Sequence, residues 1–278
     1  MTHPALNSAS VAVITGGASG IGLAAAMHFA REGMRVVIVD RATDKLRAAA
    51  DQVKDAGATD VMTAEVDVSD GDHLHALEEQ IATRFGGTDI LMNNAGVGGK
   101  SSTLEASGSW HQMLGVNLWG PINGSQVFAP RMIDRGRPGA IINTVSKQGI
   151  TTPPGNPAYN VSKAGLKAFT EALSHELRTK ADDKITAHLL IPGFVYTGMI
   201  GTPEKPPAAW TADQTVAFFI DSLNRGDFYI LCPDNDVTRD LDEKRIAWNL
   251  GDILENRPAL SRWHPDYADA FAAFVERD

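Results

Sequence analysis

Short apolar segments recur along the chain, and segments with helical spacing separate them. The apolar segments are VAVIT (11–15), RVVIVD (35–40), VMTAEVDV (61–68), DILMNNAG (89–96), AIINTVS (140–146), ITAHLLIPG (185–193) and FYILCPD (228–234). Strands that are apolar at consecutive positions are typical of a parallel sheet covered on both faces. The intervening segments, such as GLAAAMHFAREG and HLHALEEQIATRFGG, place apolar residues three or four apart, which predicts helices. The repeated strand-helix-strand order predicts a doubly wound α/β sheet with right-handed crossovers.

The same pattern predicts one domain. No segment has the composition of a linker between domains, and we expect a single unit over 1–278, with a core at about 11–234 and a C-terminal extension at 235–278. The segment GTPEKPPAAW (201–210) is rich in proline, but it only interrupts the strand-helix order after 192–193. Because binding residues often lie on such connections, we expect a loop over a site there.

Composition narrows the class of protein. The chain has 278 residues, 43% of them hydrophobic and 21% charged, as in ordinary globular proteins. Its formal net charge of −9 argues against nucleic acid or an anionic membrane as the main partner. Cys232 is the only cysteine, which excludes an intrachain disulfide and favours a reducing compartment. The start, MTHPALNSAS, lacks the basic and apolar regions of a signal peptide, so we expect a cytoplasmic protein.

A glycine-rich turn, TGGASGIG (15–22), follows the first predicted strand and opens the first predicted helix. Glycines at these positions permit a tight turn, a close approach of the backbone to a pyrophosphate, and close packing of the helix on the sheet. The free N–H groups at the start of such a helix suit a phosphate. The residues expected around the phosphates are Gly16, Ser19, Gly20, Ile21 and Gly22. By itself, the pattern also fits a tight turn that binds nothing.

The end of the second predicted strand favours NAD over NADP. Asp40 stands eighteen residues after Gly22, where an acidic side chain accepts hydrogen bonds from the adenosine ribose. No lysine or arginine stands between Gly16 and Gly20 to meet a 2′-phosphate, and Asp40 would repel that group. Arg41 could offset part of the repulsion, but it lies beyond the strand end.

The segment PAYNVSK (157–163) places Tyr159 four residues before Lys163. Four residues are about one helical turn, so both side chains share one face, about 5–6 Å apart at Cβ. A nearby positive charge favours the phenolate, whose ordinary pKa is about 10. The pair is therefore a candidate for general acid-base catalysis, although the same spacing also occurs on solvated helix faces.

Together with further motifs, the chain resembles the short-chain dehydrogenase/reductase family over about 11–234. The motifs are, in order, TG-x-x-x-GIG (15–22), NNAG (93–96), Asn117, Ser146, Tyr159 with Lys163, and PG-x-V-x-T (192–197). Thirteen residues separate the serine from the tyrosine, as is usual in the family. The resemblance implies a Rossmann fold with strand order 3-2-1-4-5-6-7. It also implies a homodimer or homotetramer formed through helices near 105–133 and 157–180.

The resemblance also implies a role for each site residue. Tyr159 would exchange a proton with an alcohol or ketone, and Lys163 would lower the pKa of Tyr159 and bind the nicotinamide ribose. Ser146 would hydrogen-bond the substrate oxygen, and Asn117 completes the catalytic set. The cofactor residues beyond the glycine turn are Asp40, Arg41, Asp67, Val68, Asn94, Ala95, Gly96, Tyr159, Lys163, Pro192, Gly193, Val195 and Thr197.

A proline four residues after Asn117 predicts a local break in the helix expected there. Pro121 has no N–H to donate to the Asn117 carbonyl, and its ring crowds that carbonyl. Gly120 weakens the turn further. We therefore expect a kink, and the resemblance implies that the freed Asn117 main-chain oxygen holds a water that contacts Lys163.

The sequence thus predicts an NAD-dependent oxidoreductase that interconverts a secondary alcohol and a ketone. An NADPH-preferring carbonyl reductase and a non-catalytic cofactor-sensing protein are the alternatives. The side chains of Phe194, Tyr196, Met199 and Trp210, with Ser146 and Tyr159, would form a substrate site suited to an aromatic or bulky molecule. The tail segment RPALSRWHPDYADAF resembles dehydrogenases that oxidise benzylic alcohols in bacterial breakdown of lignin-derived aryl ethers. Lys147 is expected to face solvent, and no metal pair is expected.

Overall fold

The computed structural model describes residues 2–276; Met1 and the last two residues of the predicted extension, 277–278, lie outside the described part. One parallel sheet forms its centre, in the order β3-β2-β1-β4-β5-β6-β7. The strands are β1 (Val11–Thr15), β2 (Arg35–Asp40), β3 (Asp60–Glu65), β4 (Ile90–Asn93), β5 (Gly139–Thr144), β6 (Ile185–Ile191) and β7 (Tyr229–Leu231). The predicted Rossmann topology is confirmed.

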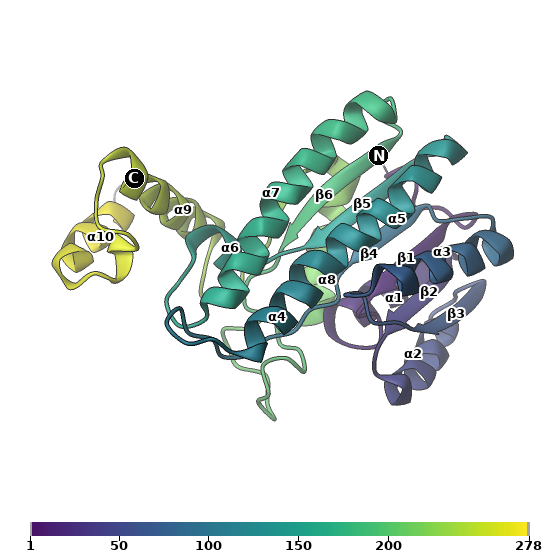
Figure 1. The fold of residues 1–278 in the computed structure, drawn as a ribbon, viewed down its shortest axis with the longest axis horizontal. Coiled ribbons are helices and arrows are strands. Elements are labelled where there is room, and N and C mark those ends of the chain that lie inside the picture. The colour runs from purple at the N-terminus through teal and green to yellow at the C-terminus, as the bar shows by residue number, and fades with distance from the viewer. Residues whose placement is uncertain (1, 277–278) are drawn as a thin grey trace.

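Helices cover both faces of this sheet (Figure 1). On one face lie α1 (Gly20–Arg31), α2 (Thr43–Asp55) and α8 (Ala212–Arg225). On the other face lie α3 (Gly71–Phe85), α5 (Gly120–Arg135) and α7 (Pro157–Lys180). The shorter elements are α4 (Gly108–Leu114), a π-helical segment (Gly115–Trp119) and α6 (Gln148–Thr151). The segment 201–210, predicted as a loop, contains no helix and only an isolated bridge between Trp210 and Val195.

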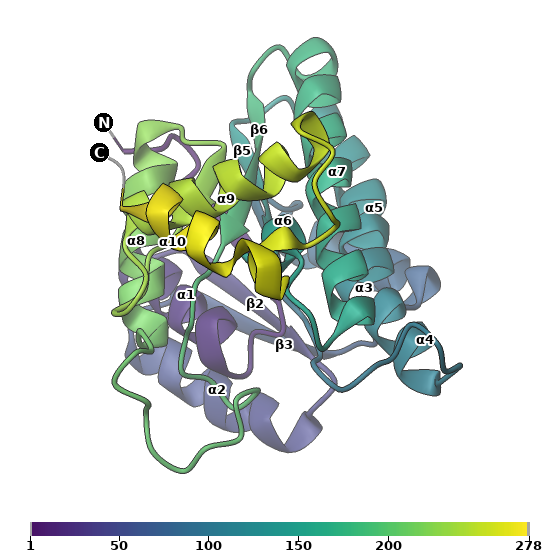
Figure 2. The ribbon, with the colours of Figure 1, turned by 90° about the vertical axis from the view of Figure 1, so that its left-hand side faces the viewer.

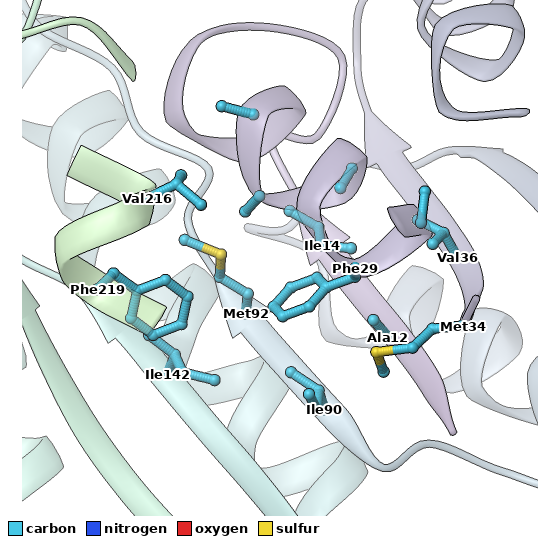
Figure 3. Packing of buried hydrophobic residues seen from close by; sticks show 14 of the residues in the cluster. Ala12, Ile14, Phe29, Met34, Val36, Ile90, Met92, Ile142, Val216 and Phe219 are labelled. Atoms are coloured by element: carbon cyan, nitrogen blue, oxygen red, sulfur yellow. The ribbon is translucent and has the colours of Figure 1, made fainter. Parts of the chain in front are cut away.

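Alternate residues of each central strand enter different apolar clusters. Ile14 of β1 lies in the cluster under α1 and α8, whereas Val13 lies in the cluster under α3 and α5. Figure 3 shows Phe29 of α1 and Phe219 of α8 packed over the first face of the sheet. Burying one such side chain contributes about 1.5–3 kcal/mol. The consecutive apolar positions of the sequence are therefore explained by a sheet that is buried on both faces.

Local hydrogen bonds fix where several helices begin. Asp70 caps α3 by accepting a hydrogen bond from the Asp72 N–H at 2.9 Å. Thr211 and Gln214 form a reciprocal capping box at the start of α8. Such caps satisfy N–H groups that have no partner within the helix. They fix the connections that leave the carboxyl ends of the strands, where the candidate site lies.

A buried chain of polar side chains ties α7 to the centre of the sheet. The Asn93 amide donates to Asn143 Oδ1 at 2.8 Å, between directly opposed residues of β4 and β5. The Asn143 amide donates to Thr170 Oγ1 at 3.0 Å, and Thr170 lies on α7. All three residues are buried. Because buried amides must be paired, this chain fixes the position of the helix that carries Tyr159 and Lys163.

The C-terminal extension forms a small unit with its own apolar centre. It contains α9 (Arg239–Leu254), two 3₁₀ turns (Ser261–Trp263 and Pro265–Tyr267) and α10 (Ala268–Val275). The ring centroid of Trp248 lies 5.3 Å from that of Phe271 and 5.2 Å from that of Phe274. The Arg257 guanidinium covers the indole at 3.9 Å. In Figure 1 the extension projects from the body near α6, and in Figure 2 it faces the viewer.

Within residues 2–276, no helix combines the length and the apolar character that crossing a bilayer would require.

Candidate active site

The turn between β1 and α1 fits tightly against the loop that follows β4. Gly16 has a φ of +63°, and a Cβ at this position would lie 2.8 Å from the Ala95 Cα. A Cβ on Gly22 would overlap the Gly16 carbonyl oxygen and lie 2.7 Å from Asn94 Nδ2. Glycine is therefore required at both positions by the packing of the protein itself. The Thr197 side chain approaches Gly20 from the other side, so the loop after β6 also reaches this turn.

The start of α1 has the features of a phosphate site. Its N-cap residue, Ser19, has an extended backbone with φ −161° and makes no side-chain hydrogen bond to the helix. The first amides of an α-helix have no partner within the helix, and the helix dipole favours an anion beside them. All five residues predicted around the phosphates are thus gathered at one helix end that no side chain caps.

Asp40 lies beside the same turn, at the end of β2. Its Oδ2 accepts a hydrogen bond from the Ala18 N–H at 3.2 Å, and its Oδ1 accepts one from Ala42 N–H at 3.0 Å. These bonds hold the carboxylate at the edge of the glycine turn. Asp40 therefore also has a structural role, which the sequence did not indicate.

Arg41 is paired rather than free in solvent. Its Nη1 lies 3.3 Å from Asp67 Oδ2, while Asp67 Oδ1 accepts hydrogen bonds from the Ser69 hydroxyl at 2.7 Å and the Ser69 N–H at 3.0 Å. The hydrogen bond from the Ser69 hydroxyl is the main cause that lowers the pKa of Asp67, and Arg41 adds to it. The pair brings the predicted residues Asp67 and Val68 to the side of the site near β2 and β3.

The loop after β4 is fixed between β1 and β5. The Asn94 N–H donates to Thr15 Oγ1 at 2.9 Å, and the Asn94 side-chain amide donates to the Thr15 carbonyl at 3.2 Å. The Thr144 hydroxyl donates to Asn94 Oδ1 at 3.4 Å. Asn94 is therefore mainly a support for the backbone of Ala95 and Gly96, which passes between the glycine turn and Lys163.

Asn117 holds the same loop from the helical side. Its side chain accepts a hydrogen bond from the Val97 N–H at 2.8 Å and donates one to the Val97 carbonyl at 2.9 Å. The expected local break near Pro121 takes the form of a π-helical segment, where Gly120 N–H donates to the Gly115 carbonyl, and the chain continues as α5. The wide turn is a departure from α-helical hydrogen bonding at the place where Pro121 cannot donate. A water between the Asn117 carbonyl and Lys163 stays a prediction.

Ser146, Tyr159 and Lys163 meet at the carboxyl end of β5. Ser146 follows β5 and accepts a hydrogen bond from the Gln148 N–H at 3.2 Å, at the start of α6. The Ser146 hydroxyl also lies close enough to the Tyr159 phenol to oppose the rise in its pKa. Lys163 donates to the Thr144 carbonyl at 2.9 Å, and its Nζ lies 5.7 Å from the centroid of the Tyr159 ring. A Cβ on Gly149 would lie 2.6 Å from the Lys163 carbonyl carbon, so α6 rests directly on α7.

Burial dominates the electrostatics of this cluster. It lowers the pKa of Lys163 from its ordinary 10.5 to about 8. It also raises the pKa of Tyr159, against the opposing effect of the nearby Ser146 hydroxyl. The Lys163 ammonium bonds to the Thr144 carbonyl and lies over the Tyr159 ring. The expectation that Lys163 lowers the pKa of Tyr159 stays a prediction.

The predicted substrate residues divide into two groups. Phe194 and Met199 expose 40% and 55% of their surface, and Met199 contacts the loop after β4 near Gly98. Tyr196 and Trp210 instead build the loop that carries them. The Tyr196 hydroxyl donates to the Pro203 carbonyl at 3.0 Å, and the Tyr196 N–H donates to the Trp210 carbonyl at 2.8 Å.

The indole of Trp210 is partly buried at the edge of the core. It packs on Phe218 of α8 with ring centroids 6.0 Å apart, and it lies against the apolar cluster on that face of the sheet. Its role in substrate binding stays a prediction.

The expectation that Lys147 faces solvent is wrong. Its side chain is only 17% exposed, and its Nζ lies 2.6 Å from Asp242 Oδ2 and 3.3 Å from Asp234 Oδ2. The burial is imposed by the C-terminal extension, because Asp242 lies in the first turn of α9. No local pattern around 147 signals a partner that is almost one hundred residues away in sequence.

Sequence reasoning also missed the contacts that fix the start of α7. Ser101 Oγ donates to Asn156 Oδ1 at 2.7 Å and accepts from the Ala158 N–H at 3.0 Å. The Asn156 amide donates to the Gly99 carbonyl at 2.8 Å. These bonds join the loop after β4 to the residues just before Tyr159. Serine and asparagine in loops have no periodic pattern, so the sequence offers no signal for them.

Among residues 2–276, no three histidine, cysteine, aspartate or glutamate side chains gather in an arrangement that could bind a metal ion.

Comparison with known proteins places this geometry in a family. A family model described as short chain dehydrogenase matches residues 10–206. The chain is 31% identical over 250 residues to 1-deoxy-11-beta-hydroxypentalenate dehydrogenase from Streptomyces avermitilis, covering 86% of this chain and 90% of that protein. It is 31% identical over 268 residues to a CLA biosynthesis dehydrogenase/reductase from Lactiplantibacillus plantarum, covering 96% of this chain and 92% of that protein.

Solved structures show the same likeness. A short chain dehydrogenase/reductase from Burkholderia phymatum in complex with NAD has a TM-score of 0.81 and 31% identity, over 90% of this chain and 95% of that one. LigD from Sphingobium sp. strain SYK-6, in its apo form, has a TM-score of 0.75 and 25% identity, over 87% and 96%. An alcohol dehydrogenase from Thermococcus sibiricus complexed with 5-hydroxy-NADP has a TM-score of 0.69 and 27% identity, over 77% and 90%. The chain belongs to the short-chain dehydrogenase/reductase family of oxidoreductases.

Proposed function

We propose that this protein is an NAD-dependent oxidoreductase that interconverts a secondary alcohol and a ketone, with Tyr159 as the general acid and base. The observation that carries the proposal is the cluster of the partly exposed Ser146 and Tyr159 with the buried Lys163, together with the uncapped start of α1. A partly buried phenol beside a buried ammonium contributes little to stability but is suited to proton exchange.

The chain's own residues fit a nicotinamide dinucleotide. The first amides of α1 and the Ser19 hydroxyl would hold the phosphates. The Lys163 ammonium has three donors, of which Thr144 accepts one, and the others would meet ribose hydroxyls. Residues 192–197 would hold the carboxamide. When bound, the dinucleotide supplies a hydride acceptor or donor at C4 of its ring.

Tyr159 and its neighbours would handle the proton. In oxidation the phenolate oxygen accepts the hydroxyl proton of the alcohol, and in reduction the phenol donates a proton to the ketone oxygen. The Ser146 hydroxyl holds the same substrate oxygen and stabilises the charge that develops there. Lys163, with its pKa lowered to about 8, lies over the Tyr159 ring and bonds to the Thr144 carbonyl, so a water would have to carry the proton between the phenol and the ammonium.

Two features of the chain support NAD over NADP. The Asp40 carboxylate is held beside the glycine turn, where a 2′-phosphate would meet a like charge. Arg41, the nearest candidate to bind that phosphate, is already paired with Asp67. The solved relatives include complexes with NAD and with 5-hydroxy-NADP, so the preference must come from residues of this chain.

The substrate that we propose is bulky or aromatic, as in a benzylic alcohol. The support is the pair of exposed apolar side chains, Phe194 and Met199, at the loop that approaches both the glycine turn and the loop after β4. Exposed apolar side chains beside a few polar groups are typical of sites for small organic molecules.

The test is turnover of a panel of secondary alcohols, including 1-phenylethanol and cyclohexanol, with NAD and with NADP. We expect reduction of NAD, with kcat/KM at least about tenfold higher than with NADP, equivalent to about 1.4 kcal/mol. Faster turnover with NADP would favour the carbonyl reductase. Tight dinucleotide binding without turnover of any alcohol or ketone would favour the cofactor sensor.

We also propose a homo-oligomer formed through the helices at 105–133 and 157–180. Trp119 in the π-helical segment exposes 55% of its surface, and Val161 on α7 exposes 48%. Sedimentation at micromolar concentration checks this proposal, and a stable monomer would contradict it.

A further inference from the structure

A buried ion pair joins the C-terminal extension to the residue that follows Ser146. The Lys147 ammonium lies between two carboxylates, 2.6 Å from Asp242 Oδ2 and 3.3 Å from Asp234 Oδ2. The exposed fractions of the three side chains are 17%, 6% and 5%, respectively. A buried ammonium is costly unless carboxylates compensate it. The position of Lys147 is therefore coupled to both carboxylates.

Asp234 extends this link to the loop after β6. Its Oδ2 also accepts a hydrogen bond from the Phe194 N–H at 3.0 Å, and its Oδ1 accepts one from the Val237 N–H at 2.8 Å. Lys147 thus contacts the carboxylate of Asp234, which holds the loops after β6 and β7. In sequence, Lys147 directly follows Ser146.

Further contacts of α9 with the body lie at the same place. Ile246 of α9 and Ile150 of α6 pack against the same apolar cluster, which includes Val145 and Leu231. The Asn249 amide donates to the Ile150 carbonyl at 3.4 Å. A cavity of about 50 Å³ lies between α6 and α9, with Lys147 and Asp242 on its wall. The extension therefore meets the body at α6, the short helix that begins two residues after Ser146.

Four charged groups face Asp242 from the elements around it. They are Lys147 from the loop after β5, Asp234 from the loop after β7, Arg245 from α9 and Arg262 from the first 3₁₀ turn. Burial raises the pKa of Asp242, and the hydrogen bond and charge of Lys147 oppose that shift. Burial and the nearby Arg245 lower the pKa of Arg262 to about 10. Without the Asp242 carboxylate, Lys147 would keep Asp234 as its one carboxylate partner, and Arg245 and Arg262 would lose the negative charge that faces them.

We propose that Asp242 is a positioning residue for Ser146. Asp242 holds the side chain of Lys147, and Lys147 in turn fixes the backbone of Ser146, so the C-terminal extension helps to hold the active site in place. The inference rests on the function proposed above. When the charge of Asp242 is removed, Lys147 keeps one carboxylate partner and faces two arginines. Its side chain must move, and the backbone of Ser146 and the start of α6 move with it. The Ser146 hydroxyl then loses its alignment with the Tyr159 phenol.

The first arm of the test is amide hydrogen exchange in α6 and in the loop that carries Ser146, measured on the full chain. In Asp242→Asn we expect exchange at 147–152 to accelerate about tenfold or more, because the loop loses its buried anchor. The matched control is Asp240→Asn. Asp240 lies in the same first turn of α9, but its carboxylate is 71% exposed and pairs only with Lys244. We expect wild-type exchange at 147–152 in the control.

The second arm is kinetic and uses NAD with 1-phenylethanol. In Asp242→Asn we expect kcat to fall about tenfold, because a displacement of about 1 Å of a catalytic group has an effect of this order or larger. The Kd for NAD, from fluorescence quenching, should stay within about twofold, since the glycine turn is untouched. A general loss of folding would instead reduce the active fraction and leave the kcat of the remaining folded enzyme unchanged.

Lys147→Met and the double variant Lys147→Met/Asp242→Asn complete the design. Because both residues act through one pair, the double variant should lose no more kcat than the worse single variant. If Asp242→Asn fails to fold, Lys147→Met tests the same link from the other side. Unchanged exchange at 147–152, or faster exchange with unchanged kcat, overturns the proposal. If the wild type oxidises no alcohol, the function proposed above fails, and the exchange arm alone decides whether Asp242 holds the Ser146 loop.

Discussion

Charged groups at the two ends of the carboxyl edge of the sheet lie in opposite environments. At the end near β2 and β3, the side chains of Arg41 and Asp67 are 60% and 35% exposed. Near β5 and β6, Lys163 is 4% exposed, and the Lys147 side chain is 17% exposed and lies against two carboxylates. An exposed pair contributes about 0–1 kcal/mol and is screened by salt, whereas a buried charge shifts its own pKa and depends on its neighbours. The fold should therefore tolerate substitutions at the exposed end better than substitutions of the charges near β5 and β6.

The largest effect should come from Tyr159→Phe, which removes only the hydroxyl at the buried end. General acid-base catalysis contributes about 10²–10⁴-fold, so we expect kcat to fall by roughly 10³. The Kd for NAD should change by less than about twofold, because the ring remains in place. Steady-state kinetics and fluorescence titration check both values. Substantial turnover in this variant would remove Tyr159 from the proposed proton transfer.

Lys163→Met should reveal the cost of burying an ammonium. The pKa of Lys163 falls from 10.5 to about 8 in the folded protein, so between these pH values the folded state binds fewer protons than the unfolded state. The contribution of this group to the free energy of unfolding therefore rises with pH across that window, and its full cost is present below pH 8. Relative to Lys163→Met, the wild type should gain about 3 kcal/mol between pH 7 and 10.5.

Urea unfolding of both proteins without dinucleotide, at several pH values, measures this difference. Groups other than Lys163 are common to the two proteins and cancel in the comparison. A constant difference from pH 7 to 10.5 would show that Lys163 is not desolvated.

Asp40→Ser tests the more exposed end, where we expect a smaller effect. The ratio of kcat/KM for NAD over NADP should fall about tenfold, by about 1.4 kcal/mol, because the charge that opposes a 2′-phosphate is gone. Serine can still accept the hydrogen bond from the Ala18 N–H, so the turn should keep its shape. An unchanged ratio would locate cofactor choice elsewhere.

Arg41→Gln should have the smallest effect. Its exposed pair with Asp67 should change the free energy of unfolding by no more than about 0.5 kcal/mol, and that difference should shrink in high salt. Urea unfolding at low and high salt measures it. If Arg41→Gln changed the free energy of unfolding by as much as we expect for Lys163, the exposed and buried charges would not differ in the way described above.

The strands were predictable because the sheet is buried on both faces. The segments 11–15 and 35–40 coincide with β1 and β2. The segment 61–68 runs past the end of β3 at Glu65, because Val66 and Val68 remain buried after the ladder ends. An apolar segment indicates which residues are buried, but not which residues form the hydrogen bonds of the sheet. Such segments therefore predict where a strand lies better than they predict where it ends.

The features of the candidate site also divide into those that the sequence predicts and those that it does not. The glycine turn and the Tyr159–Lys163 pair are encoded over a few residues, where backbone geometry fixes their spacing. The partners of Lys147 and the packing of Trp210 depend on contacts between distant segments. Spacing in a sequence carries no information on such contacts, and for this reason the predictions for both residues were incomplete or wrong.

Asn93, Asn143 and Thr170 restrict the ways in which β4 and β5 can pair while the chain folds. Apart from the asparagines, the paired residues are apolar, and apolar side chains can exchange neighbours at little cost. A slip of one residue would place Asn93 opposite a different side chain and leave buried amides without partners, at about 1–3 kcal/mol for each group. A sheet in which β4 and β5 pair one residue out of register is thus less stable than the native sheet, even before a ligand binds. The three polar residues therefore favour the native register while the sheet forms.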